Sequence, residues 1–464
     1  MDISEKSPLL LTQSLSKLKA PATPDVSVSK KFSFKKIDRR KKFIFVSLGF
    51  VNFCAYCCYS LLAPFFPLEA GRKGASQSIV GFIFGCFEFV IFIASPILGN
   101  YISKIGCKFM FVSGVMVGGT CAILFGLLDK CPDGAIFITM CFLCRIVEAI
   151  GTAAFVTALF AIMAYEFPDN IITVMGTLET FTGLGMMVGP AVGGALYEIG
   201  GYGLPFFVLG SVVILCGLLT SYVMPPIEEA NTHYTGSIFT MFKSPLVCLT
   251  WLNISVCSIS IGYYDPTLAG HLQQFNLSTW AIGLVFLISP SMYALTAPIV
   301  GYIGDKKGHI RAMIAVGNIG CVISWFLLGP APFLPFIPNE LYVNFIALVA
   351  FGPFLGFTLI PTFKALLLGA NSLGMPTDID TYGKVSGFFN SSFSLGAFLG
   401  PTFGGVMVDK FGFPWASVGI AGLLFLGALL MIGYICIRPE LPKPPEQDIT
   451  VDTNDPEGID EQQI

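Results

Sequence analysis

Four ionisable side chains lie inside long apolar segments of this sequence, and their types suit the binding of a positively charged molecule. They are Glu88, Arg145, Glu148 and Glu179, and Asp265 lies at the end of a further apolar segment. In helices, Glu88, Arg145 and Glu179 would each lie roughly 12 to 14 Å from the nearer helix end. In a bilayer this depth is close to the midplane, where one charge costs at least ~2.5 to 3.5 kcal/mol. Such groups usually face a cavity or a partner. Three glutamates against one arginine therefore predict a cavity for a cation.

Glu179 has no ionisable neighbour on its own segment, so we predict that it exchanges a proton for the cation. Burial penalises the ionised form of a carboxyl group, which lets such a group take up a proton on the acidic side of a membrane. Glu88 is the second candidate, and its alternative role is that of a buried, protonated hydrogen-bonding group. Asp265 precedes Pro266. It either supplies an outer acid for a multiply charged ligand or begins a turn.

Arg145 and Glu148 are three residues apart, a spacing at which opposite charges on a helix can neutralise each other. We expect Arg145 to have a structural and gating role, whereas Glu148 stays a candidate for coupling. Aromatic rings can hold ammonium groups by cation–π attraction, and simple packing is the alternative reading. The candidates for such a cage are Phe155, Phe181, Tyr263 and Tyr264.

The composition is that of an integral membrane protein. Of 464 residues, 54% are hydrophobic and only 12% are charged, and the mean hydropathy is +0.76. The fourteen cysteines lie mostly in apolar segments, which favours buried free thiols over a disulfide framework. We predict an all-α membrane protein with twelve transmembrane helices, each near the ~20 residues that a bilayer requires. Their expected ranges are 43–63, 78–101, 109–128, 136–164, 171–196, 204–224, 246–264, 279–303, 311–329, 342–364, 383–408 and 414–436.

The chain contains an internal duplication. A glycine and proline pattern in residues 176–194 recurs in residues 387–405. The matched positions are Gly176, Gly185, Gly189, Pro190, Gly193 and Gly194 in the first copy, and Gly387, Gly396, Gly400, Pro401, Gly404 and Gly405 in the second. Glycines four residues apart share one helical face, where a neighbouring helix can approach closely. We also expect Pro190 to bend its helix.

A second repeat relates residues 79–106 to residues 281–308 at an offset of 202, against 211 for the glycine pattern. Each repeat holds about six helices, so we predict two pseudo-symmetric six-helix bundles related by an axis along the membrane normal. The expected organisation is a disordered cytosolic tail, an N-terminal bundle, a cytosolic linker, a C-terminal bundle and an acidic cytosolic tail. The respective ranges are 1–42, 43–224, 225–245, 246–436 and 437–464.

Basic residues between 35 and 42 precede the first apolar segment, and they predict a cytosolic N-terminus. Because the number of spans is even, the C-terminus is expected on the same side. The N-terminal tail carries Glu5 four residues before the pair Leu9 and Leu10. This spacing resembles the dileucine signal that clathrin adaptors read, and it predicts residence in vesicles, endosomes or lysosomes.

The motifs together resemble the major facilitator superfamily, specifically its proton-coupled antiporters. The resemblance rests on a GxxxDKxG-like turn after the second and eighth helices, on Arg145 within RIVEAIGTAA, and on the glycine and proline pattern. Residues 63–76, 99–112, 178–194, 264–268 and 360–363 are similar to a divergent branch of the vesicular amine transporter family. This resemblance implies that a proton gradient, without a cofactor, drives the exchange of lumenal protons for cytosolic organic cations. For this branch the implied cargo is a polyamine such as spermine or spermidine.

The sequence departs from the family pattern at three positions where acids are expected, one in the first turn, one in helix one and one in helix eleven. Ser103 occupies the aspartate position of the first turn, before Lys104, whereas the second turn keeps Asp305 and Lys306. We therefore expect Lys104 and Lys108 to hold the gate of the first half with other partners, or more loosely. The monoamine and acetylcholine members carry acids in helices one and eleven. Residues 52–56 of this chain contain no acid and position 390 is an asparagine, which argues against the same substrates.

Other function classes find little support in the sequence. The three histidines lie in predicted loops without metal-ligand spacing, and the sequence contains neither a phosphate-binding loop nor a hydrolase nucleophile motif. We therefore expect no enzyme activity, no metal, no cofactor and no nucleic acid partner. Two alternatives to polyamine exchange stay open. They are a proton-coupled exporter of multiple drugs or other organic cations, and a sensor on the same fold that does not transport.

Overall fold

The computed structural model describes residues 38–62, 65–224, 237–277 and 279–439, and within these ranges the regular structure is entirely helical. The candidate sorting residues Glu5, Leu9 and Leu10 lie outside the described residues. The same holds for residues 440–464 and for most of the predicted linker. Asp265 lies within a described helix, but its side chain is outside the described part of the structure.

The described residues of the N-terminal half form six long helices and two short ones. The long helices are α2 (Arg39–Ser60), α4 (Gln77–Asn100), α6 (Cys107–Leu127), α7 (Ala135–Glu166), α8 (Ile171–Gly200) and α9 (Gly203–Val223). The short ones are α3 (Phe66–Arg72) and α5 (Ile102–Ile105), and single 3-10 turns occupy Leu128–Lys130 and Pro168–Asn170. The chain passes from α5 to α6 through Gly106, whose φ of 90° suits a residue without a side chain.

The C-terminal half repeats this order. It contains α10 (Pro245–Leu272), α11 (Thr279–Phe286), α12 (Ile288–Lys307), α13 (Ile310–Leu328), α14 (Leu341–Leu359), α15 (Thr362–Asn371) and α16 (Ile379–Ile437). The 3-10 helices Ile238–Lys243 and Gln273–Phe275 flank α10. Gly308, the counterpart of Gly106, again has a positive φ, of 67°.

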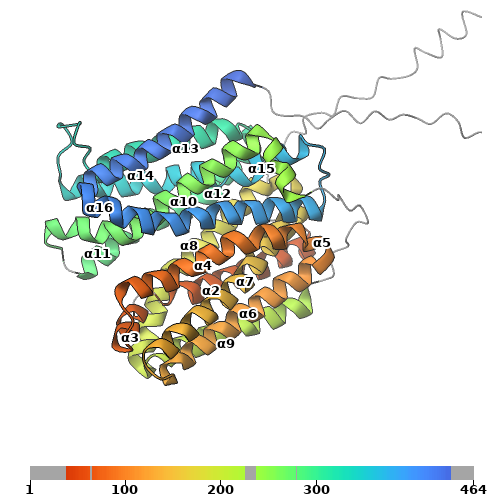
Figure 1. Ribbon diagram of the computed structural model, residues 1–464. Coiled ribbons are helices and arrows are strands. Elements are labelled where there is room, and N and C mark those ends of the chain that lie inside the picture. The colour runs from red at the N-terminus through yellow and green to blue at the C-terminus, as the bar shows by residue number, and fades with distance from the viewer. Residues whose placement is uncertain (1–37, 63–64, 225–236, 278, 440–464) are drawn as a thin grey trace, which may run out of the picture.

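Eleven segments of the described residues are long and apolar enough to cross a membrane. The last of them, α16, has 59 residues and contains one non-helical residue, Gly412, with a φ of 76°. At 1.5 Å per residue, 59 helical residues would extend about 90 Å, roughly three times the ~30 Å hydrocarbon core, so α16 consists of two spans that meet at a kink at Gly412. Figure 1 shows α16 turning back on itself. The prediction of a twelve-helix membrane protein is therefore confirmed.

The two halves form separate bundles that lie side by side (Figure 1). Across their interface, α4 packs on the first part of α16, and α8 packs on α12. Inside the halves, α8 packs on α2, and α16 packs on α10 in the corresponding way. The same helix pairs recur in both halves, as a duplicated chain should produce.

The glycine pattern explains why these helices approach so closely. A Cβ atom at Gly185 would lie 2.6 Å from the carbonyl oxygen of Phe53 on α2. In the second half, a Cβ atom at Gly396 would lie 2.3 Å from the carbonyl oxygen of Ser255 on α10. Only glycine permits this contact, because any side chain would overlap the neighbouring backbone. Gly194 and Gly405 differ, since no atom lies within 4 Å of a Cβ at either position.

Close contacts across the interface between the halves are related by the sequence offsets of the two repeats. A Cβ at Gly176 would lie 2.4 Å from the carbonyl oxygen of Ala297, and a Cβ at Gly387 would lie 2.4 Å from that of Ser95. Gly176 and Gly387 are 211 residues apart, and Ser95 and Ala297 are 202 apart. The two repeats recognised in the sequence therefore meet each other at equivalent contacts.

The molecule has two distinct ends (Figure 1). We call the end that carries α5 and α15 the α5 end, and the opposite end, which carries α3 and α11, the α3 end.

Candidate functional site

One cavity of about 610 Å³ lies between the two halves and reaches into the N-terminal half. Among the described residues that line it are three carboxylates and no lysine, arginine or histidine. The carboxylates are those of Glu88, Glu148 and Glu179. The wall is otherwise rich in aromatic rings, namely Tyr56, Tyr59, Phe84, Phe87, Phe155, Phe160, Phe389, Phe393 and Phe398. A cavity of this charge suits a cation.

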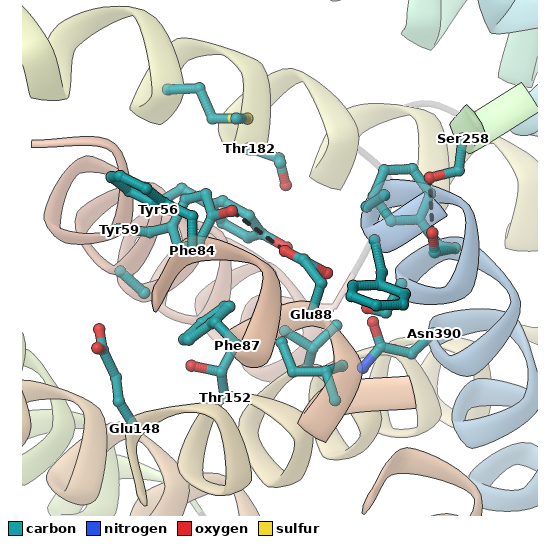
Figure 2. A pocket seen from close by; sticks show the side chains of 18 of the residues that line it. Tyr56, Tyr59, Phe84, Phe87, Glu88, Glu148, Thr152, Thr182, Ser258 and Asn390 are labelled. Atoms are coloured by element: carbon teal, nitrogen blue, oxygen red, sulfur yellow. Dashed lines mark hydrogen bonds between the residues drawn. The ribbon is translucent and has the colours of Figure 1, made fainter. Parts of the chain in front are cut away.

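Glu88 lies on α4, at the centre of the wall seen in Figure 2. The hydroxyl of Tyr59 on α2 donates a hydrogen bond to Glu88 Oε1 at 3.1 Å. Tyr59 also packs against Phe87, with ring centroids 5.2 Å apart. A ring held in this way fixes the position of the carboxyl group.

Glu179 lies on α8, the helix that carries the first glycine pattern. Tyr293 of α12 lies beside this carboxylate, but their polar atoms do not form a hydrogen bond of normal geometry. The counterpart of Glu179 is Asn390 on α16, which lines the same cavity and donates a hydrogen bond to Ser95 Oγ at 2.8 Å. The two halves thus present equivalent positions to the cavity, and only the N-terminal one is acidic.

Arg145 on α7 is fully buried, and its Nη1 donates to Glu148 Oε2 at 2.8 Å. The guanidinium group also lies over the ring of Phe87, 4.4 Å from its centroid. The expected pair at a spacing of three residues is present, and Arg145 itself does not line the cavity. Glu148 does line it, so its second oxygen can still meet a ligand.

The predicted aromatic cage is largely wrong. Phe155 lines the cavity, but Tyr263 and Tyr264 are buried inside the C-terminal half. Phe181 points elsewhere, because its ring covers Gly49 of α2. The spacing of residues along the sequence cannot predict which of these side chains faces the cavity, since each of the four residues lies on a helix with more than one buried face.

At the α5 end, Asp305 joins the two halves. Its carboxylate accepts hydrogen bonds from the backbone amides of Ile172 at 3.2 Å and Thr173 at 2.7 Å, in the first turn of α8. The Thr173 hydroxyl donates a third at 2.7 Å, and Lys364 lies 3.3 Å away. A carboxylate at a helix N-terminus is stabilised by the helix dipole. Lys306, the next residue, lies instead over Tyr302 of its own helix.

The corresponding closure of the first half uses different groups. The Ser103 hydroxyl donates to Asp380 Oδ1 at 2.8 Å, and Lys384 pairs with Asp380 Oδ2 at 2.6 Å. Lys104 and Lys108, which we expected to hold this gate, make their contacts within the N-terminal half among the residues that the structure describes. Lys104 lies over Tyr101, and Lys108 donates to the carbonyl of Met224. The acid missing from the turn is therefore replaced by an acid on α16.

Aromatic rings close the cavity toward the α5 end. Phe160 of α7 contacts Phe389 of α16 and Phe363 of α15, with centroids 5.5 and 6.1 Å apart. Toward the α3 end, the lining includes Gly81 and Gly85, which lie within three turns of the start of α4. The cavity thus extends toward the α3 end and ends at Phe160.

Sequence reasoning missed several residues of this arrangement, above all Tyr59, Phe160, Asp380 and Lys384. Asp380 and Lys384 are four residues apart, which is ion-pair spacing on a helix. They escaped notice because the expected helix began at residue 383, whereas α16 begins at Ile379. No sequence signal separates Tyr59 and Phe160 from the many aromatic residues that only pack.

Comparisons with known proteins agree with this architecture. The family model of the Major Facilitator Superfamily matches residues 48–377 and 250–453. The human MFS-type transporter SLC18B1 is 43% identical over 400 residues, covering 86% of this chain and 87% of its own length. The human synaptic vesicular amine transporter is 25% identical, covering 75% of this chain and 65% of its own.

A solved structure shares the fold. The crystal structure of the human organic anion transporter MFSD10 superposes with a TM-score of 0.66 at 14% identity, covering 84% of this chain and 99% of that one. An identity this low supports the fold alone. With the family match and the similarity to SLC18B1, the helix arrangement identifies the class. The chain belongs to the Major Facilitator Superfamily and is a multi-pass membrane transporter, not an enzyme.

Proposed function

We propose that this protein exchanges lumenal protons for cytosolic organic cations, and that polyamines such as spermine and spermidine are its main cargo. The observation that carries the proposal is the cavity, which combines three carboxylates with no basic lining residue among the described ones. Ligand sites of this class typically measure ≈ 300–1,000 Å³, and the cavity falls in that range.

Glu179 is the proposed exchange group. Burial favours the neutral form of a carboxyl group, so a small difference in pH can change its charge. Ionised and facing the cytosol, Glu179 binds the cation. Protonated and facing an acidic lumen, Glu179 releases it. Rocking of the two halves carries the site between these states, and the proton gradient supplies the driving force without a cofactor.

The orientation of the membrane protein follows from its basic residues. Arg39, Arg40, Lys41 and Lys42 lie at the start of α2, at the α5 end. Basic residues concentrate on the cytosolic side of membrane proteins, so we assign the α5 end and both termini to the cytosol. In this assignment the structure is closed toward the cytosol and its cavity extends toward the lumen.

The nature of the cargo and the location rest on the relatives. Their names include vesicular amine and acetylcholine transporters, which supports an amine as substrate and a vesicle as the compartment. Asn390 stands where those families carry an acid, which favours a different amine. We propose endosomes, lysosomes or secretory vesicles as the location, reached through clathrin adaptors that read Glu5, Leu9 and Leu10.

The test is uptake of labelled spermidine into proteoliposomes with an acidic interior. We expect uptake by the full-length protein that disappears when the pH gradient is collapsed. Glu179→Gln should lose the dependence on pH. Glu198→Gln changes the same residue type on the same helix at an exposed position outside the cavity, and it should behave as wild type. Unchanged pH dependence in Glu179→Gln would refute the role of this residue.

The aromatic lining also supports a second candidate function, an exporter of bulky aromatic cations. Nine rings of the described residues line the cavity, more than an aliphatic amine requires. Competition separates the two candidates, because both types of amine can be added to the same spermidine uptake assay. Stronger inhibition by aromatic monoamines than by spermine would favour the exporter.

A further inference from the structure

The cavity is not symmetric about the interface between the halves. In the C-terminal half, its described lining residues come only from α10 and α16. In the N-terminal half they also come from α6 and α9, which pack on other helices of that half. The cavity therefore has a side lobe inside the N-terminal bundle. We define this lobe by Cys58, Gly114, Gly118, Glu148 and Val213.

Side-chain volume explains the asymmetry. In the C-terminal half, Tyr263, Trp325 and Phe351 pack together, with successive ring centroids 5.2 and 5.5 Å apart. These buried rings fill the interior of that bundle. In the N-terminal half, a Cβ at Gly118 would meet no atom within 4 Å, so the space beside α6 is open. The lobe exists because Gly118 of α6 places no side chain in it.

One charged group faces this lobe. Glu148 is only 7% exposed, and it lines the cavity while Arg145 occupies its Oε2 atom. The guanidinium carbon of Arg145 also lies over the rings of Phe87, Phe84 and Tyr59, at 4.4, 5.7 and 5.9 Å from their centroids. These rings stabilise its positive charge by cation–π attraction. The Oε1 atom of Glu148 is thus left to accept a hydrogen bond from a ligand.

Glu88, another carboxylate of the cavity, lies away from the lobe. Figure 2 shows Glu148 on one side of the cavity and Asn390 on the other, with Glu88 between them. Phe87 lies between Glu148 and Glu88 in this view, and Tyr59 is hydrogen-bonded to Glu88. A compact monovalent cation can reach one of these carboxylates at a time, whereas an elongated cation with a charge at each end can reach both.

We propose that the lobe at Glu148 is a second ammonium subsite, which selects elongated cations carrying at least two separated amines. One amine of the ligand binds at Glu88 and Glu179 between the halves, and the other binds at Glu148 inside the N-terminal bundle. Gly118 keeps the lobe open. This inference rests on the proposed function for the class of cargo, but it concerns binding and does not require transport.

The test compares the binding of 1,6-diaminohexane and hexylamine to the purified full-length protein by isothermal titration calorimetry. These probes differ only in the second amine. We expect the wild type to bind the diamine at least about tenfold more tightly, which corresponds to one additional charged contact. Gly118→Val, which fills the lobe, should bring the ratio of the two dissociation constants close to one. Glu148→Gln should do the same.

The control is Gly422→Val, since Gly422 is an exposed position on α16 where a Cβ would also meet no atom within 4 Å. It should keep the wild-type ratio. Glu148→Gln leaves buried Arg145 without its partner and can fail to fold, so Gly118→Val decides the matter. A wild-type ratio in Gly118→Val, or equal binding of both probes to the wild type, would overturn the subsite. Diamine-selective binding without proton-driven uptake would support the subsite and reject the proposed function.

Discussion

The closure between Ser103 and Asp380 makes a prediction opposite to the one that the family pattern suggests. Restoring the family aspartate by Ser103→Asp should weaken the gate, because the new carboxylate would face Asp380 across the contact that now measures 2.8 Å. A hydrogen bond to a charged group contributes about 1.5–3 kcal/mol, and this contribution is lost.

Repulsion adds to that loss. Two carboxylates about 4 Å apart repel by roughly 4 kcal/mol at an effective dielectric constant of about 20. Lys384, 2.6 Å from Asp380, offsets part of this repulsion. We therefore expect a net destabilisation of the closed state by at least about 2 kcal/mol, which lowers the ratio of closed to open protein roughly thirtyfold.

Hydrogen–deuterium exchange of the backbone amides measures this change in the ratio of closed to open protein. Peptides covering residues 99–106 and 378–390 should exchange faster in Ser103→Asp than in the wild type. The double variant Ser103→Asp/Asp380→Ser swaps the positions of the hydrogen-bond donor and acceptor. It should therefore recover the slow amide exchange of the wild type. Ser78→Asp introduces the same charge at an exposed position near the opposite end of α4 and should have no effect on these peptides. If Ser103→Asp exchanged like the wild type, or if the double variant stayed open, the reasoning would fail.

Two further predictions concern the packing of the glycine pattern and the closure at Asp305. Gly189→Ala would place a Cβ 2.1 Å from Ser60 Oγ, so we expect a lower midpoint of thermal denaturation and a cost of about 1–3 kcal/mol, while Gly194→Ala, with no atom within 4 Å, should be neutral. Equal midpoints would contradict close packing of α2 and α8. Asp305→Asn removes the charge at the N-terminus of α8 and should weaken closure by about 1–2 kcal/mol, seen as faster exchange of residues 168–176. Unchanged exchange there would show that the charge is unimportant.

Most of the architecture could be predicted from the sequence, because the bilayer restricts the possible structures so strongly. Apolar segments of about 20 residues must be helices in lipid, since every backbone group needs an internal partner. The boundaries were less predictable. Residues 342–364 are divided between α14 and α15, and the span predicted to begin at residue 383 begins at Ile379.

The site was predictable only in part. Glu88, Glu148 and Glu179 were singled out because charge is costly at membrane depth, and all three line the cavity. Their proposed roles stay predictions. The partners of these acids could not be read from the sequence, since Tyr59 reaches Glu88 from another helix.

The sequence by itself determined which residues repeat, how many helices cross the membrane and which charges lie at membrane depth. Each of these follows from composition and spacing along one chain. Only the tertiary structure decided that Ser103 meets Asp380, that the cavity enters the N-terminal half, and that Tyr263 and Trp325 fill the other half. The reason is physical. Contacts between residues hundreds of positions apart depend on the rotation of each helix about its axis, and side-chain packing sets that rotation.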